Sequence, residues 1–133
     1  MLVELEIGLR LLLAAALGAI IGFQREKAGK PTGLRTVVLV CVGAALFTIV
    51  SAYGFGTAAD PSRIAAGIVV GISFLGAGAI LHHDGGVIEG LTTAATIWVV
   101  AAIGLAVGAG LYIITVVAAT IVLIILFLPH PIR

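Results

Sequence analysis

The chain has 133 residues, of which 62% are apolar and only 10% are charged, and its formal net charge is +1. A soluble domain carries about 25% charged residues to cover its surface. The composition therefore excludes a water-soluble fold and predicts an all-α membrane protein. The small net charge gives no reason to expect a nucleic-acid partner, and a single cysteine, Cys41, excludes an intrachain disulfide.

Four long stretches of the sequence contain no charged residue, and a helix needs about 20 residues to cross the hydrocarbon core. These are residues 11–24, 36–59, 64–81 and 90–132. The last stretch is too long for one span, because about 43 helical residues would reach about 65 Å. The sequence therefore predicts a single domain, residues 1–133, built as a bundle of five transmembrane helices. Their expected ranges are 3–23, 35–53, 63–81, 90–106 and 110–128.

Basic residues around the first predicted loop indicate the orientation of the bundle. The loop and its flank hold four of them: Arg25, Lys27, Lys30 and Arg35. The second loop has only Arg63. Since cytoplasmic loops carry the excess of Lys and Arg, we expect the first loop in the cytoplasm, the N-terminus outside and, after five crossings, the C-terminus inside.

Three pairs of glycines stand four residues apart: Gly18 and Gly22, Gly67 and Gly71, and Gly104 and Gly108. This spacing puts both members of a pair on one helical face, where a neighbouring backbone can approach closely. We interpret the pairs as packing faces within the bundle, with a homodimer interface as the alternative. Residues 74–78 also contain Gly76 and Gly78, which favours a helix break or a close backbone approach there.

Arg10 lies within the first predicted span, where a cation costs at least about 2.5–3.5 kcal/mol near the bilayer centre. Glu6 stands one helical turn earlier on the same face. We therefore expect the two side chains to form an ion pair near the interface. A functional pair that faces the bundle interior or a partner subunit is the alternative.

The first loop, residues 24–34, combines a tight turn with charged residues. Pro31 and its flanking glycines favour the turn, and Thr32 or Thr36 is suited to cap the next helix. Basic side chains around a helix N-terminus favour an anion, such as a phosphate or a lipid headgroup. The alternative is a solvated loop that sets the topology. The candidate residues are Arg25, Glu26, Lys30 and Arg35.

The third loop, residues 82–89, holds four residues of types that bind metals: His82, His83, Asp84 and Glu89. Adjacent histidines diverge on a helix or strand, and Asp-Gly-Gly is itself a turn signal, so no metal site is predicted. Thr92 and Thr93 follow, where hydroxyls satisfy backbone carbonyls or bond across helices. The spans lack the acid that cation-coupled transporters place near the midplane. No nucleophile has a base and an orienting group, so neither an enzyme nor a cofactor is predicted.

A short internal similarity links the two halves of the chain. Residues 17–19, followed by residues 33–36, resemble residues 75–77, followed by residues 90–93. The separations are nearly equal, which favours two helical hairpins related as a parallel repeat.

Four motifs occur in a characteristic order: IGFQRE at residues 21–26, KPTGLRT at 30–36, FLGAG at 74–78 and GLTTAA at 90–95. Together they resemble the membrane domain of the MgtC/SapB family, and the likeness covers residues 8–112. The sequence departs from the family pattern at Ser73, where glycine is usual, and at Glu89, where a basic residue is common. The pair His82 and His83 also replaces a turn that often contains lysine.

The resemblance implies a bacterial inner-membrane protein associated with growth under magnesium limitation, survival inside host cells or acid stress. The family is not generally regarded as a magnesium transporter, and some members are linked to restraint of the ATP synthase. Members known as virulence factors continue into a soluble cytoplasmic domain. We expect this chain to be a short form without that domain.

The leading hypothesis is a non-enzymatic protein that packs against another membrane complex, with the ATP synthase as one candidate. The glycine-lined faces would form the contact, oriented by Arg10, Arg25, Glu26 and Arg35. The alternatives are an ion or small-solute pathway formed by an oligomer, and a sensor of anionic lipid. The expected partners are membrane lipids, a membrane protein and, as an alternative, a second copy of the chain.

Overall fold

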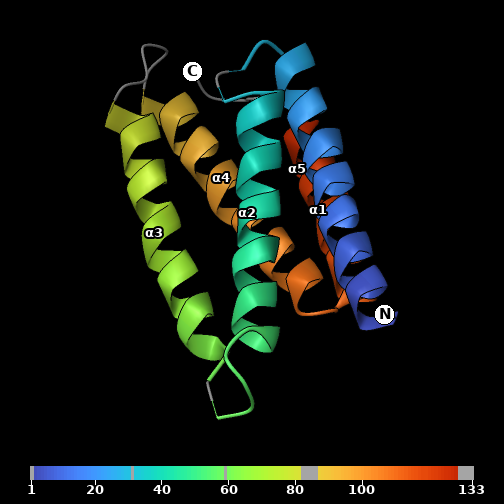
Figure 1. The fold of residues 1–133 in the computed structure, drawn as a ribbon. Helices are drawn as coiled ribbons and strands as arrows, with labels where there is room; N and C mark the ends of the chain where they lie inside the picture. Colours follow the sequence, from blue (N-terminus) through green and yellow to red (C-terminus); the bar gives the residue numbers. More distant parts are fainter. Residues whose placement is uncertain (1, 31, 59, 82–86, 129–133) are drawn as a thin grey trace.

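The computed structural model describes residues 2–30, 32–58, 60–81 and 87–128, with the backbone alone for residues 87–89. Within these ranges the chain forms five α-helices and no β-strand (Figure 1). They are α1 (Leu2–Lys27), α2 (Leu34–Tyr53), α3 (Ser62–Leu81), α4 (Val87–Gly108) and α5 (Tyr112–Leu126). The predicted all-α bundle of five helices is confirmed.

The first four helices are long and apolar enough to cross a membrane. The fifth has 15 residues, which reach about 22 Å along the helix axis, less than the roughly 30 Å of a hydrocarbon core. It begins two residues later than predicted because Gly110, with φ +85°, turns the chain after α4. It ends at Leu126, two residues before the predicted boundary.

Consecutive helices run in opposite directions, so α1 and α3 point one way and α2 and α4 the other (Figure 1). The N-terminal end of α1 lies at one end of the bundle, and the last turn of α5 lies at the other (Figure 1). This arrangement matches an odd number of predicted passes. The assignment of one end to the cytoplasm remains a prediction.

The bounds of α1 and α4 and one predicted helix break also differ from the structure. α1 continues four residues beyond the expected end, through Lys27. Basic residues in this last turn stabilise it, because they interact favourably with the negative end of the helix dipole. α4 extends beyond the expected range at both ends. The helix break expected at residues 74–78 is absent, because α3 is continuous there. At Gly76 the segment packs against α4, where an added Cβ would lie 3.4 Å from Cβ of Ala94, so the contact is an ordinary one and not the close backbone approach expected as the alternative.

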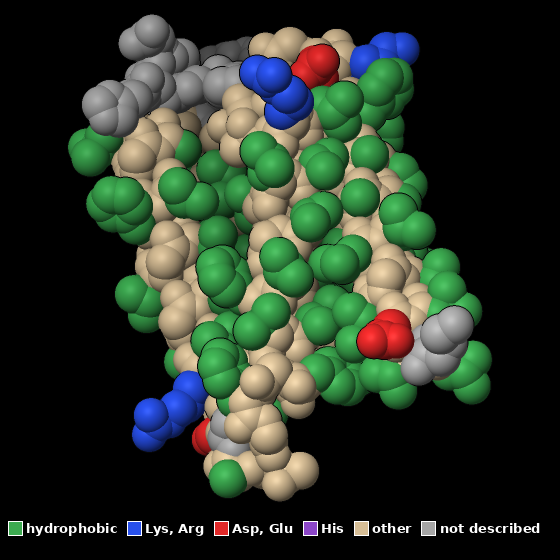
Figure 2. Space-filling model, viewed as in Figure 1, with side chains coloured by type: hydrophobic (Ala, Val, Ile, Leu, Met, Phe, Trp, Pro, Cys, Tyr) green, Lys and Arg blue, Asp and Glu red, His purple; other side chains and the backbone are tan. Residues whose placement is uncertain are grey.

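The core is formed by small and branched apolar residues, and α4 contacts every other helix. Cys41 is completely buried in it, where it packs as a small apolar side chain. Large apolar side chains cover the outside, including Phe74 on α3 and Ile113 on α5, which are 80% and 81% exposed. In Figure 2 the charged side chains gather at the two ends and apolar ones cover the face between. Such a surface requires lipid as its solvent.

The internal similarity has a counterpart in the packing. Gly18 of α1 lies against Val38 and Cys41 of α2, and Gly76 of α3 lies against Ala94 of α4. Both glycines stand in the first helix of a hairpin, and both hairpins run in the same direction (Figure 1). Both features agree with the expected parallel repeat, which stays a prediction.

The turn before α3 contains a titratable group whose effect on stability can be tested. Oδ1 of Asp60 accepts hydrogen bonds from the Ser62 hydroxyl at 2.7 Å and from the Ser62 amide at 3.0 Å. These two bonds lower the pKa of the Asp60 carboxyl below its ordinary value. Because the pKa is lower in the folded chain, the carboxylate stabilises the turn above about pH 4 and loses this effect as the pH falls through the folded pKa.

We therefore expect Asp60→Asn to lower the thermal midpoint slightly at pH 7, and this difference to shrink as the pH falls below the ordinary pKa of the carboxyl. Thermal unfolding of both proteins in detergent, followed by far-UV circular dichroism between pH 2 and 7, measures this difference. A gap between the two midpoints that stays constant over the whole pH range would contradict the role of the carboxylate.

Candidate functional site

The buried guanidinium of Arg25 connects three of the four motifs on which the family resemblance depends. Arg25 is only 1% exposed. Its Nε donates to the carbonyl oxygen of Thr32 at 3.1 Å, and its Nη2 donates to Oγ1 of Thr93 at 2.8 Å. Its Nη1 lies 3.5 Å from Oγ1 of Thr96, whose hydroxyl donates to the Thr92 carbonyl. The alternative of a solvated loop does not hold for Arg25, because this residue lies in the last turn of α1 and its side chain is buried against Thr93 of α4.

Glu26, the next residue, provides the cap of α2. Its Oε1 accepts a hydrogen bond from the amide of Leu34 at 3.0 Å. The predicted threonine caps are therefore replaced by a carboxylate from the preceding helix, which suits the positive end of the helix dipole. Thr32 instead adopts φ +59°, a left-handed conformation that is uncommon for threonine, and presents its carbonyl to Arg25.

At the N-terminus of α2, where an anion site is predicted, one backbone amide is already bonded to a carboxylate of the chain itself. The Leu34 amide is already bonded to the internal carboxylate of Glu26, so it is not open to a phosphate. Arg35 is exposed and Lys30 is partly exposed. Both remain accessible to lipid headgroups, whereas Arg25 does not.

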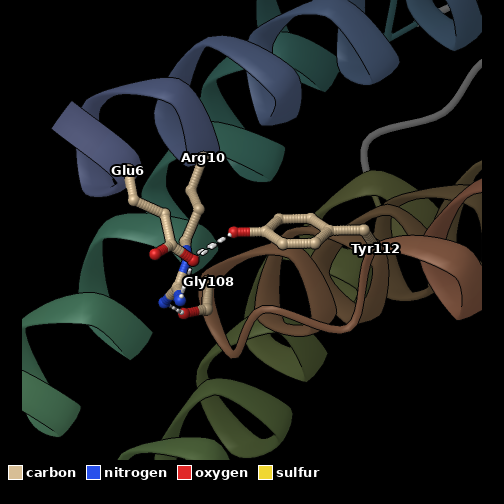
Figure 3. Close-up of polar contacts among 4 residues, drawn as sticks. All are labelled: Glu6, Arg10, Gly108 and Tyr112. Atoms are coloured by element: carbon tan, nitrogen blue, oxygen red, sulfur yellow. Dashed lines mark hydrogen bonds and ion pairs between the residues drawn. The ribbon is translucent and has the colours of Figure 1, made fainter. Parts of the chain in front are cut away.

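A second polar cluster lies at the opposite end of the bundle and centres on Arg10 (Figure 3). Its Nη2 forms the predicted ion pair with Oε2 of Glu6 at 2.8 Å. Its Nη1 donates to the carbonyl oxygen of Gly108 at 2.9 Å, and its Nε donates to the Tyr112 hydroxyl at 2.9 Å. That hydroxyl donates to Oε2 of Glu6 at 2.8 Å. The Arg10 guanidinium also lies 5.6 Å from the ring of Tyr53, so the cluster joins α1, α2, α4 and α5.

Removal of the Tyr112 hydroxyl tests this cluster. We expect Tyr112→Phe to lower the free energy of unfolding by about 1–2 kcal/mol, because a hydrogen bond to each of two charged groups is lost while the ring remains. The measurement is detergent-denaturation of Tyr112→Phe, Glu6→Gln and the double variant. A coupling energy of at least about 0.5 kcal/mol is expected between the two sites. Strict additivity would contradict the shared network.

Two of the three glycine pairs form packing faces inside the chain. A side chain at Gly18 or Gly22 would meet the backbone of α2, with Cα of Leu34 only 2.8 Å from a Cβ at Gly22. At Gly104 a Cβ would overlap the carbonyl oxygen of Cys41, and at Gly108 it would lie 2.7 Å from the carbonyl oxygen of Ala45. These glycines therefore bring α1 and α4 into backbone contact with α2.

The third pair lies on an open surface. A Cβ at Gly67 or Gly71 would meet no atom within 4 Å, and both residues are exposed. The expected packing within the bundle is not found for this pair, because α3 packs mainly against α4 and only loosely against α2. The two glycines instead line a groove of about 660 Å³ between α2 and α3. Figure 2 shows the hollow, with apolar side chains at its floor.

The remaining candidates have local roles or lie outside the description. Thr93 is buried against Arg25, Thr92 is partly buried, and Gly78 has open space around it. Residues 82–86 and the Glu89 side chain, which include the metal-binding residue types, fall outside the described residues. Among the residues that are described, no three His, Cys, Asp or Glu side chains gather as a metal site would require.

Sequence reasoning missed Tyr112 and Thr96 as partners of the two arginines. Both partners lie far along the chain from the arginine that they bind, so no local spacing indicates the contact. The groove between α2 and α3 was missed as well, although the three residues Gly43, Gly67 and Gly71 that open it were visible as glycines. The groove could have been predicted from these glycines, because they leave little side-chain volume on two successive helices.

Comparison with known proteins places these features in a family. The family model described as MgtC family matches residues 11–133. The chain is 46% identical to the Escherichia coli (strain K12) protein named "Putative magnesium transporter YhiD", over 94% of this chain and 61% of that protein. It is 44% identical to protein SapB of Bacillus subtilis (strain 168), over 83% of this chain and 50% of SapB.

A third relative is protein MgtC of Brucella abortus (strain 2308), which is 45% identical over 89% of this chain and 49% of MgtC. The chain thus spans about half to three-fifths of the length of these relatives. No solved structure matches it. With four helices able to span a membrane and a family model that covers nearly all of its length, the chain belongs to the MgtC family.

Proposed function

We propose that the chain is a non-enzymatic, multi-pass protein of the bacterial inner membrane that acts by packing α3 against a helix of another membrane protein. Its role is in adaptation to magnesium limitation, which family membership and the name of the Escherichia coli relative support. The ATP synthase is the candidate partner that the family resemblance implies. The single observation that carries the proposal is the exposure of α3.

The α3 helix differs from the other long helices in how little of it is covered. Gly76 is its only buried residue among those described. By contrast, α1 contacts α2, α4 and α5. On the flank of α3 away from the groove, Ala66, Ser73 and Ala77 are exposed at spacings of seven and four residues. Small residues on one face let a second membrane helix approach closely, so this flank suits a partner helix.

The polar groups inside the bundle support a role in assembly rather than in chemistry. The two buried arginines are held by hydroxyls, carbonyls and, for Arg10, a carboxylate of the same chain. The hydroxyls of the buried residues Thr48, Thr96 and Thr115 each donate to the carbonyl four residues earlier. Such bonds satisfy polar groups within a helix. Other molecules in the bilayer therefore meet the apolar outer surface of the bundle and not these polar groups.

Site-directed crosslinking in magnesium-starved cells tests the proposal. A photoreactive crosslinker attached to Ser73→Cys, in a Cys41→Ala background, is expected to capture a membrane protein of another kind. The bulky substitutions Ala66→Leu and Ala77→Leu should reduce the captured amount several-fold. The matched control is Ile113→Cys on α5, which is also exposed on the outside of the bundle and should capture none.

Three outcomes would contradict the proposal. These are capture of the same protein from both positions, capture of a second copy of the chain alone, and capture of no protein. Antibodies against ATP synthase membrane subunits identify that candidate among the captured products. A steady flux of magnesium, protons or potassium through the purified protein in liposomes would favour the alternative of a transport pathway.

A further inference from the structure

The groove between α2 and α3 has a polar residue at each end and is otherwise apolar or glycine. Thr36 of α2 lies at one end and Arg63 of α3 at the other. Its volume of about 660 Å³ is bounded on its long sides by the two helices. Gly43, Gly67 and Gly71 leave its interior open, since a Cβ on any of them would meet no atom within 4 Å. The groove is therefore a slot that exists because these three glycines have no side chain to fill it.

The part of the slot that α3 lines is about as long as one leaflet of a bilayer. On α3 its lining runs from Arg63 to Leu75, which is about 18 Å of helix at about 1.5 Å per residue. Half of a hydrocarbon core of about 30 Å is about 15 Å. A partner helix would need a face through both leaflets, about 30 Å long, and would have a diameter of about 10–12 Å. Because Thr36 lies in the first turn of α2, the slot as a whole reaches toward both ends of the bundle, so the charge at its Arg63 end, and not its length, distinguishes an acyl chain from a helix.

The charge at the mouth of the groove indicates the headgroup. Arg63 is exposed, and no hydrogen bond or ion pair joins its guanidinium to another residue that the structure describes. The nearest acid in sequence, Asp60, already accepts two hydrogen bonds from Ser62. A guanidinium binds a phosphate through two parallel N–H donors. Arg63 is thus placed to receive a phosphate at the level where an acyl chain would enter the slot.

We propose that the groove between α2 and α3 holds one acyl chain of an anionic glycerophospholipid whose phosphate pairs with Arg63. The chain lies over Gly67 and Gly71, and the headgroup remains at the end of the bundle near the N-terminus of α3. This site is separate from the flank of α3 assigned to a partner protein, so either proposal can fail without the other. The occupant is a lipid of the surrounding bilayer.

Fluorescence quenching by lipids brominated on their acyl chains tests the site. The native tryptophan, Trp98, lies on α4, is 55% exposed and is not part of the groove. A variant with Trp98→Phe and Phe47→Trp reports from the groove instead. Each protein is reconstituted in phosphatidylcholine vesicles with increasing fractions of brominated phosphatidylglycerol or, separately, of brominated phosphatidylcholine.

The groove reporter is expected to prefer phosphatidylglycerol about five-fold, which corresponds to about 1 kcal/mol for one basic residue at an anionic surface. Trp98 in the otherwise unchanged protein should show a ratio near one. Arg63→Gln should bring the groove ratio close to one, and Arg63→Lys should restore part of it. Gly67→Leu combined with Gly71→Leu should reduce quenching of the groove reporter by both lipids.

Several results would overturn the proposal. They are equal quenching of the groove reporter by the two lipids, a preference that survives Arg63→Gln, and a groove reporter that neither lipid quenches. The last result would indicate a protein in the groove, either a second copy or another partner. An unchanged response of Trp98 to both lipids in an Arg63→Gln single variant shows that the fold is intact, so a lost preference is then a property of the site.

Discussion

Gly104→Ala should be among the most destabilising single-methyl changes in this protein, with an expected loss of about 3 kcal/mol in the free energy of unfolding. The new Cβ would overlap the carbonyl oxygen of Cys41 and would lie 3.0 Å from Cβ of Ala44. A backbone carbonyl within a helix cannot rotate away, so α4 must separate from α2. Overpacking of a well-packed core costs about 1–3 kcal/mol, and here the contact is at the centre of the bundle.

Detergent-denaturation followed by circular dichroism measures this loss, and Gly67→Ala is the matched control. Gly67 stands in a helix and belongs to a pair with the same spacing, but a Cβ there has open space. Its replacement should leave stability unchanged or raise it by up to about 1 kcal/mol, because alanine favours a helix over glycine. Equal effects of the two substitutions would contradict the close contact between α2 and α4 at Gly104.

Arg25→Met should cost about 2–3 kcal/mol of unfolding free energy. The substitution keeps a long side chain but removes the donors to Thr32 and Thr93. It leaves a carbonyl and a hydroxyl without these partners, and a hydrogen bond to a charged group contributes about 1.5–3 kcal/mol. The loss should loosen the junction of α1, the turn before α2 and the start of α4.

Arg35→Met is the control for Arg25→Met, since Arg35 is exposed in the first turn of α2 and exposed charges contribute about 0–1 kcal/mol. Arg25→Lys should fall between the wild type and Arg25→Met, because an ammonium keeps the charge without the planar fork of donors. Accelerated hydrogen exchange at the amides of residues 28–30 and 32–36 would locate the loosening. Equal stability of the Met variants at 25 and 35 would contradict a structural role for Arg25.

The expected results separate two kinds of glycine in one chain. Gly104 and Gly108 hold α4 against α2, whereas Gly67 and Gly71 face the groove. The same spacing therefore serves internal packing in one helix and an outward surface in another. Substitutions that damage only function should lie on α3, and substitutions that damage folding should lie on the buried pairs.

The amino-acid sequence by itself determined the membrane environment, the number of helices and the contacts within one helical turn. Composition excludes a soluble fold because too few charged residues are available to cover it. The Glu6 and Arg10 pair was predictable because residues four apart share a helical face. The four motifs between residues 21 and 95 were sufficient to indicate the family.

Only the tertiary structure decided which helical faces meet one another and which meet lipid. It buried Arg25 beside Thr93, joined Arg10 to Tyr112 on a distant helix, and left Gly67 on an open groove. The physical reason is that nearly every face of these helices is apolar, and lipid tails are as apolar as leucine side chains. Hydrophobicity therefore carries no information on whether a face meets a lipid or another helix, and close packing makes that choice.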